Sequence, residues 1–167
     1  REGFAEARAL YDRLSTNEVE PGVVILYGSM YGNTEQLADV IAQSLASAGV
    51  EKIVCHNVSK SDPSEILADI FRYRGLIVGS PTYCGELFTP IENLLNMVRI
   101  RDVKERLYAA FGSYTWAPAA LKRLRPFAEE MKWESVSEGM ELKMADLPSV
   151  TEAAWELGVS MAERLKA

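Results

Sequence analysis

The chain has 167 residues, of which 48% are apolar, and its formal net charge is −6. This length fits one domain with a short appendage, and no stretch approaches the roughly 20 apolar residues of a membrane span. The acidic balance argues against nucleic acids and membranes as partners, while two cysteines and no secretory signal lead us to expect a cytoplasmic protein without a disulfide framework.

Residues 1–20 differ in pattern from the rest of the chain. Phe4, Leu10 and Leu14 belong to a short apolar stripe at helical spacing, and a polar connector follows it. The chain begins with Arg1 rather than Met. We therefore expect a linker helix and connector in residues 1–20, coming from an upstream domain, and a separate domain in residues 21–167.

From Pro21 onward, apolar runs alternate with segments of helical period. The predicted strands are Val23–Tyr27, Lys52–Val58, Gly75–Gly79, Leu107–Phe111 and a weaker fifth within Ser135–Met144. Capping-box patterns predict helix starts at Asn33, Asp62, Thr89 and Ser149, and an apolar face predicts one more helix across Leu121, Leu124, Ala128 and Met131. Strands that alternate with helices predict an α/β domain with a doubly wound, five-stranded parallel sheet. Ligands of such a sheet bind at the carboxyl ends of its strands.

Three loops should meet at that edge of the sheet. The first contains Ser29, Met30, Tyr31, Gly32, Asn33 and Thr34. The second contains Pro81, Thr82, Tyr83, Cys84 and Gly85. The third contains Ser113, Tyr114, Thr115, Trp116 and Ala117.

The first loop has the composition of a phosphate site built from neutral donors. Ser29, Asn33 and Thr34 offer hydroxyl and amide groups, Gly32 permits close backbone approach, and the start of a helix attracts an anion. The loop lacks the lysine of a nucleoside triphosphate site and the glycine pattern of a dinucleotide site. A monophosphate ester fits best. The alternative is a polar turn that caps the helix and binds nothing.

Aromatic side chains in all three loops indicate a planar ligand. Tyr31, Tyr83, Tyr114 and Trp116 would gather at one edge, where rings can stack on a conjugated ring system. A monophosphate joined to such a ring system describes FMN. The alternative is that these aromatics pack on helices or on a partner protein.

The stretches "YGSMYGNTEQLADVIA", "VGSPTYCGELF" and "AAFGSYTWAPAALKRL" resemble the flavodoxin-like domain of flavodiiron proteins, also called A-type flavoproteins. The resemblance covers about residue 22 to the end of the chain. It implies a flavodoxin-like fold with strand order 2-1-3-4-5, and FMN held by the sixteen residues of the three loops. It also implies electron transfer to a diiron centre in a preceding β-lactamase-like domain, in the same chain or across a homodimer. The implied electron donor is a small protein such as a rubredoxin or its reductase, and the final acceptor is oxygen or nitric oxide.

Two departures from the family pattern bear on these expectations. Thr115 stands where relatives have a glycine beside the flavin ring, and Pro118 follows in the same loop. The chain also has one histidine, His56, so it lacks the ligands of a diiron centre. We expect no catalytic or metal-binding residues here, a solvated or packed His56, and no pairing of Cys55 with Cys84.

Other readings of the same topology are weaker. A receiver domain needs acidic residues where Ser29 and Ser80 stand, and neither the phosphatase C-x5-R pattern nor the hydrolase G-x-S-x-G pattern is present. A stand-alone FMN-dependent quinone reductase, or a non-redox adaptor whose aromatics dock a partner, remain as alternatives. The colour of the purified protein separates the adaptor from the flavoproteins.

Overall fold

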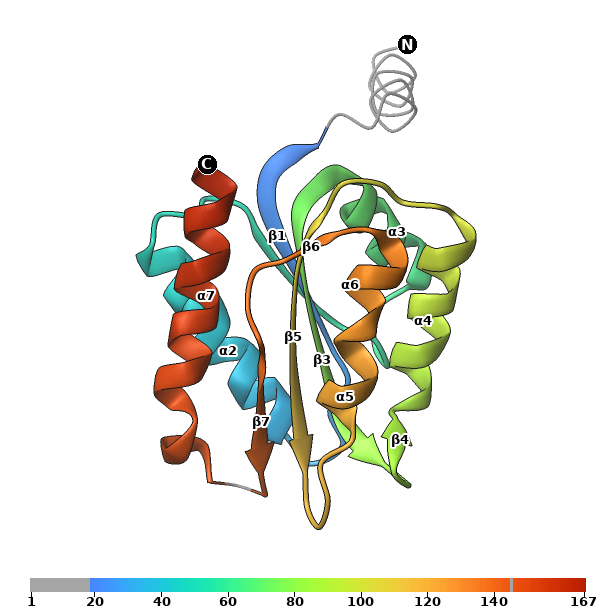
Figure 1. The fold of residues 1–167 in the computed structure, drawn as a ribbon, viewed down its shortest axis with the longest axis vertical. Helices are drawn as coiled ribbons and strands as arrows, with labels where there is room; N and C mark the ends of the chain where they lie inside the picture. Colours follow the sequence, from blue (N-terminus) through green and yellow to red (C-terminus); the bar gives the residue numbers. More distant parts are fainter. Residues whose placement is uncertain (1–18, 145) are drawn as a thin grey trace.

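The computed structural model describes residues 19–144 and 146–167, in which a central sheet is covered by helices on both faces (Figure 1). The strands are β1 (Glu20–Tyr27), β2 (Ile53–Asn57), β3 (Tyr73–Tyr83), β4 (Glu86–Leu87), β5 (Leu107–Tyr114), β6 (Glu134–Ser135) and β7 (Met140–Lys143). The helices are α2 (Asn33–Ser47), α3 (Pro63–Arg72), α4 (Thr89–Ile100), α5 (Ala120–Leu124), α6 (Pro126–Met131), η1 (Leu147–Ser149) and α7 (Thr151–Lys166). The linker helix expected in residues 1–20 lies, up to residue 18, outside the described residues.

The main sheet has the predicted topology. Its order is β2-β1-β3-β5-β6, and these neighbouring strands are parallel. Both β6 and β7 pair with β5, through Tyr108 with Ser135 and Phe111 with Met140, so they are two pieces of the predicted fifth strand. Counted along the chain, the order 2-1-3-4-5 and the fold class are confirmed. The short β4 is an addition, antiparallel to the end of β3.

Each face of the sheet has its own core. In Figure 1, α2 and α7 cover one face and α3, α4, α5 and α6 cover the other. Successive residues of β1 alternate between the two cores, with Val23 and Ile25 in one and Val24 and Leu26 in the other. Because both faces are covered, the strand is apolar without a break, which explains the continuous runs in the sequence.

Two strands continue beyond their predicted carboxyl ends. The sequence predicted ends at Gly79 and Phe111, but β3 continues to Tyr83 and β5 to Tyr114. The pairing of Pro81 with Ser113 extends their ladder. The second and third loops therefore begin as strand, and only their tips are turns.

Three of the four predicted helix caps were wrong. Among these four helices only α3 has the predicted cap, where Asp62 accepts a hydrogen bond of 2.8 Å from the N–H of Ser64. Helix α2 starts at Asn33 behind Gly32, whose φ of 88° places it in the left-handed region, and Thr89 is already the first residue of α4. Before α7 the N-cap is Val150, with no side-chain bond.

The helix predicted after the third loop is divided in two at Pro126. Its apolar face is nevertheless right, because Leu121, Leu124 and Ala128 are buried on the same side. Proline has no N–H for the helical ladder, and α6 restarts with Pro126 as its first residue.

Candidate functional site

The first loop forms a tight turn between β1 and α2. Ser29 Oγ accepts a hydrogen bond of 3.0 Å from the N–H of Gly32, and the carbonyl of Gly32 accepts one of 3.0 Å from the N–H of Gln36. A Cβ built on Gly32 would meet nothing within 4 Å, so space is open beside this residue. No side chain caps the start of α2. Its first N–H groups are therefore available at the turn.

A buried pair of hydroxyls joins the first loop to the third. Thr34 Oγ1 and Ser113 Oγ lie 2.8 Å apart, and both residues are at least 95% buried, with exposed fractions of 1% and 5%. One hydroxyl of the pair donates to the other, so one proton remains for another acceptor. The two loops are thereby fixed at a common position at the ends of β1 and β5.

The second loop is the hairpin between β3 and β4. Tyr83 pairs with Glu86, and the two intervening residues, Cys84 and Gly85, have φ of 51° and 78°. Two positive φ values are those of a type I′ turn, which suits the twist of a two-residue hairpin. Ser80 Oγ anchors the hairpin by accepting a bond of 3.0 Å from the N–H of Phe88.

Two adjoining hollows lie between the loops. The smaller, of about 50 Å³, is lined by Ser29, Met30, Tyr31, Asn33, Thr34, Pro81, Thr82, Ser113, Tyr114 and Thr115. The larger, of about 410 Å³, is lined by Met30, Tyr31, Thr82, Tyr83, Cys84, Gly85, Thr115, Trp116 and Ala117. Every residue predicted for the site except Gly32 lines one hollow or the other. The structure thus brings the three loops together at the carboxyl edge.

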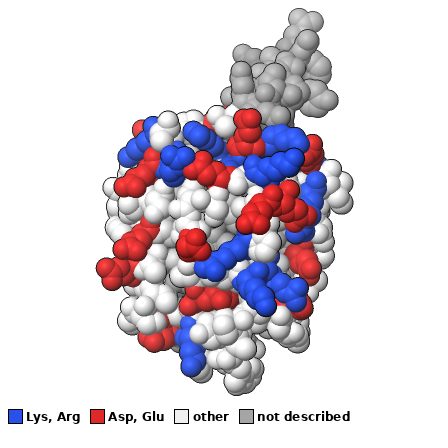
Figure 2. Space-filling view, viewed as in Figure 1, with Lys and Arg blue, Asp and Glu red and all other residues white. Residues whose placement is uncertain are grey.

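The larger hollow is flanked by exposed aromatic rings. Tyr31 is 84% exposed and Trp116 is 93% exposed, whereas Tyr83 is held against Phe88 by an edge-to-face contact of 6.4 Å. In the view of Figure 2, uncharged residues form the tip of the molecule at this end. Large rings left in water at one edge indicate a surface that a planar ligand or a partner covers.

The departure at Thr115 does not strain the backbone. Thr115 is not among the residues with positive φ, so its Cβ is accommodated in this loop. Pro118 is exposed and lies two residues before α5 begins. The loop can therefore take this sequence without the glycine that relatives have.

The remaining candidates are accounted for by local contacts. His56 is packed, as one of the two expectations had it, with Nε2 2.7 Å from Asp69 Oδ2. Cys55 and Cys84 are both free, as predicted.

Within residues 19–144 and 146–167, no three His, Cys, Asp or Glu side chains form a group that could hold a metal ion. No helix in the same part of the chain is long and apolar enough to cross a membrane.

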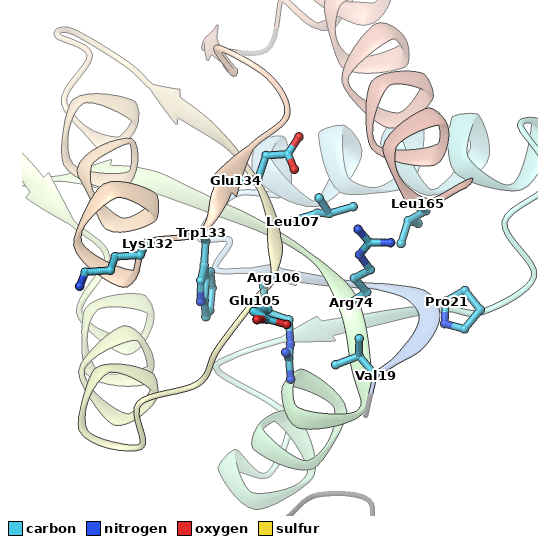
Figure 3. Close-up of a pocket in the computed structure, with 10 residues that line it drawn as sticks. All are labelled: Val19, Pro21, Arg74, Glu105, Arg106, Leu107, Lys132, Trp133, Glu134 and Leu165. Carbon is cyan, nitrogen blue, oxygen red and sulfur yellow. The ribbon is translucent and has the colours of Figure 1, made fainter. Parts of the chain in front are cut away.

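Another hollow, of about 530 Å³, opens at the opposite edge of the sheet (Figure 3). Its charged side chains do not point toward a common position where a ligand could bind. Arg106 donates to the carbonyls of Ile70 and Phe71, and Glu134 pairs with Arg164. In Figure 3, Lys132 points away from Arg74. The carboxyl edge therefore remains the candidate site.

The model of the flavodoxin family matches residues 25–158. The chain belongs to the flavodoxin family. That span contains all three loops of the site. The family's cofactor is FMN, which joins a monophosphate to a planar ring system, the two ligand parts that the composition of the loops predicted.

Curated relatives of this flavodoxin domain are larger proteins. It is 36% identical over 125 residues to an anaerobic nitric oxide reductase flavorubredoxin of Vibrio vulnificus, which covers 74% of the chain and 25% of the relative. It is 28% identical over 168 residues to the putative diflavin flavoprotein A 6 of Nostoc sp., covering 99% of the chain and 29% of that relative. The chain thus spans about a quarter of the length of the curated relatives that it matches.

Solved structures agree in fold. The Flv1 flavodiiron core from Synechocystis sp. superposes with a TM-score of 0.81 at 28% identity, covering 99% of this chain and 41% of that one. The rubredoxin oxygen:oxidoreductase of Desulfovibrio gigas superposes with a TM-score of 0.88 at 24% identity, covering 93% and 39%. Together with the curated relatives, these matches identify the chain as a flavodoxin-like domain of the kind found in flavodiiron proteins.

The loops fit FMN on the structure's own evidence. Hydroxyls and free N–H groups surround the smaller hollow, which suits a phosphate, and exposed rings flank the larger one, which suits a flat ring system. Two residues that shape this edge, Ser80 and Glu141, were not assigned to the site from the sequence. Ser80 lies in the quoted stretch "VGSPTYCGELF", but nothing in that stretch shows that its hydroxyl anchors the hairpin, and Glu141 lies in no motif.

Proposed function

We propose that the three loops hold FMN and that the domain transfers electrons through it. Ser29, Asn33 and Thr34, with the N–H groups at the start of α2, would bind the phosphate. Tyr31 and Trp116 would pack against the ring system. The observation that carries the proposal is the adjacency of a small polar hollow and a larger one flanked by two highly exposed rings.

When bound, FMN supplies reversible one- and two-electron redox chemistry. The residues of this chain bind, orient and shield it. The phosphate site contains no cationic side chain among its lining residues, so charge is balanced by hydrogen bonds and by the partial positive charge of the α2 N-terminus. No residue of the three loops is assigned a proton-transfer role.

Within a larger protein, the domain would pass electrons to a diiron centre in a preceding β-lactamase-like domain, in the same chain or across a homodimer. Its donor would be a small electron-transfer protein such as a rubredoxin or its reductase. Support comes from the names of the relatives, which include a flavorubredoxin, a flavodiiron core and a rubredoxin oxygen:oxidoreductase. Reduction of oxygen or nitric oxide would then belong to the iron domain and not to this chain.

Titration of the flavin-free protein with FMN and with riboflavin tests the binding proposal. Ser29→Ala combined with Thr34→Ala should weaken FMN binding more than riboflavin binding, because riboflavin lacks the phosphate. We expect about a 100-fold greater loss for FMN, equal to the loss of two charge-assisted hydrogen bonds of about 1.5 kcal/mol each. Equal losses for both ligands would show that the loop does not hold phosphate. A colourless protein that ignores added FMN would support the adaptor instead.

A kinetic experiment separates the relay from a stand-alone reductase. The purified, FMN-loaded domain should be reduced by a rubredoxin and its reductase, and should not oxidise NADH or NADPH directly in the presence of a quinone. Rapid quinone reduction by nicotinamide alone would favour the reductase alternative.

A further inference from the structure

The helix that follows the third loop begins without a cap of its own. Ala119 is the N-cap of α5 and offers no side-chain hydrogen bond. The orphan N–H groups of this helix are satisfied by side chains from two other strands. Thr82 Oγ1, at the end of β3, accepts hydrogen bonds of 3.1 Å from the N–H of Ala119 and 3.1 Å from the N–H of Ala120.

Glu141, on β7, completes this arrangement. Its Oε1 accepts a hydrogen bond of 3.1 Å from the N–H of Leu121. The carboxylate reaches the helix across Gly112, where an added Cβ would lie only 2.9 Å from Glu141 Cγ. Three successive N–H groups therefore bond to two side chains that are 20 and more residues away in the chain.

These bonds fix the carboxyl-terminal end of the third loop, where α5 begins. The amino-terminal end of the loop is held by β5, in which Tyr114 pairs with Lys143. Between them, residues 115–118 are exposed and carry Trp116 beside the larger hollow. With no buried side chain of its own, this stretch depends on its two ends for its position.

We propose that Thr82 and Glu141 are positioning residues, which hold Trp116 against the flavin ring by capping α5. This assigns Thr82 a different role from the direct flavin contact that sequence motifs predict. The inference rests on the proposed function, because it concerns binding of the ring at the same site. Both residues should affect binding of the ring and leave binding of the phosphate unchanged.

A double-mutant cycle between Thr82 and Trp116 tests the proposal. Thr82→Val should raise the riboflavin Kd about three- to tenfold, as expected for a lost cap, and should raise the FMN Kd by the same factor. In a Trp116→Ala background the same change should have almost no effect, because the ring that Thr82 positions is gone. If Thr82→Val costs the same in both backgrounds, Thr82 contacts the flavin itself and the proposal is overturned.

Two further variants control for general damage. Thr82→Ser keeps the hydroxyl and should restore riboflavin affinity. Thr89→Val removes a threonine hydroxyl from the uncapped start of α4 and should leave affinity unchanged. If Thr82→Ser binds as poorly as Thr82→Val, the hydroxyl is not the important group, which contradicts the proposal.

Limited proteolysis of the flavin-free protein provides a readout that needs no cofactor. Chymotrypsin should cleave after Trp116 several-fold faster in Thr82→Val and in Glu141→Ala than in the wild type, with the fragments identified by mass. Unchanged cleavage would overturn the positioning role. If the wild type fails to bind FMN but cleavage rises as expected, the proposed function fails and the capping role stands.

Discussion

Cys84 occupies a backbone position that suits asparagine or glycine. It is the first residue of the two-residue turn between β3 and β4, with φ of 51°. In this left-handed region the Cβ of most residues approaches a carbonyl oxygen, whereas asparagine tolerates it better. The turn Cys84-Gly85 therefore stores strain beside the larger hollow.

Replacing Cys84 with asparagine should stabilise the domain. Cys84→Asn creates the Asn-Gly pair preferred in type I′ turns, and we expect about 0.5–1 kcal/mol of added stability. Urea unfolding of the flavin-free protein measures it. Cys84→Ala is the matched control, because it removes the thiol but keeps a Cβ at positive φ and should give no gain. A gain as large in Cys84→Ala would mean that the thiol, and not the backbone, is unfavourable.

The raised pKa of Tyr27 predicts that the free energy of unfolding of the domain falls at alkaline pH. Burial raises the pKa of Tyr27 to about 12 from an ordinary value of 10.0, and its hydrogen bond to Glu35 acts in the same direction. The hydroxyl donates to Glu35 Oε1 over 2.8 Å. A raised pKa means that the folded state favours the protonated form. Its contribution is therefore complete below pH 10 and is lost as pH rises toward 12.

Removing the Tyr27 hydroxyl should therefore flatten the upper part of the pH–stability curve. We expect the urea midpoint of Tyr27→Phe to fall less steeply than that of the wild type between pH 10 and 12. Glu35→Gln should give an intermediate slope, because it removes the secondary cause and leaves the burial. Identical slopes for wild type and Tyr27→Phe would show that Tyr27 does not carry this dependence.

At the scale of elements, the contact between α2 and α7 depends on two small residues. Gly158 of α7 lies against Ser44 of α2, and an added Cβ would be 1.7 Å from Ser44 Oγ and 2.9 Å from the carbonyl oxygen of Ile41. Ser44 is fully buried, and its hydroxyl donates to that same carbonyl over 2.9 Å. The helices can approach this closely only because position 158 has no side chain.

Gly158→Ala should therefore destabilise the domain although alanine favours helix. The propensity gain is about 1 kcal/mol, and the cost of overpacking reaches about 3 kcal/mol at so close a contact, so we expect a net loss of about 2 kcal/mol. Thermal unfolding followed by far-UV circular dichroism measures it. Ser44→Gly should recover part of the loss in the double variant, and only part, because the Ile41 carbonyl remains close. A stable Gly158→Ala protein would contradict the tight contact.

The elements also show which parts of the structure a sequence can predict. The strands were predictable because runs such as Val23–Tyr27 are apolar on both faces, and the convergence of the loops follows from parallel topology alone. Three of the four capping side chains were not, because Gly32, Phe88 and Val150 take the N-cap positions of α2, α4 and α7. Pro81 was predicted to lie in a loop, because proline has no N–H to donate within a sheet. It belongs to β3 because it pairs with Ser113 of the neighbouring strand, which the local sequence does not show.

At the scale of the whole molecule, the sequence predicted which loops come together but not how their residues bond to one another. Fifteen residues in three sequence segments line the two hollows, as the loop motifs indicated. The bonds between them join residues that are far apart, such as Thr34 with Ser113 and Thr82 with Ala119. Such pairs depend on sheet register and rotamer, and composition carries no record of either. The sequence therefore predicts which residues gather at this edge, and the contacts between them come from the fold.

The electrostatic field at the site depends more on nearby charges than on the net charge of −6. Exposed charges are screened beyond about 10 Å at moderate ionic strength, so acidic residues at the opposite edge contribute little. Glu86 lies in the hairpin beside the larger hollow and forms an exposed ion pair with Arg123. Breaking that pair leaves one uncompensated charge beside the larger hollow, where we propose that the flavin ring binds.

We therefore predict that the two members of this pair shift the flavin potential in opposite directions. Arg123→Gln leaves the negative charge of Glu86 unpaired and should lower the two-electron midpoint potential, whereas Glu86→Gln should raise it. A unit charge within the screening length of about 10 Å contributes roughly 0.4 kcal/mol in water, or on the order of 10 mV for two electrons. Spectroelectrochemical titration at low salt measures the shifts, which should vanish at 1 M salt. The exposed Glu163 near the end of α7 provides the control, and Glu163→Gln should leave the potential unchanged. Shifts of the same sign in both members of the pair would mean that the mutations move the loops and do not act through charge.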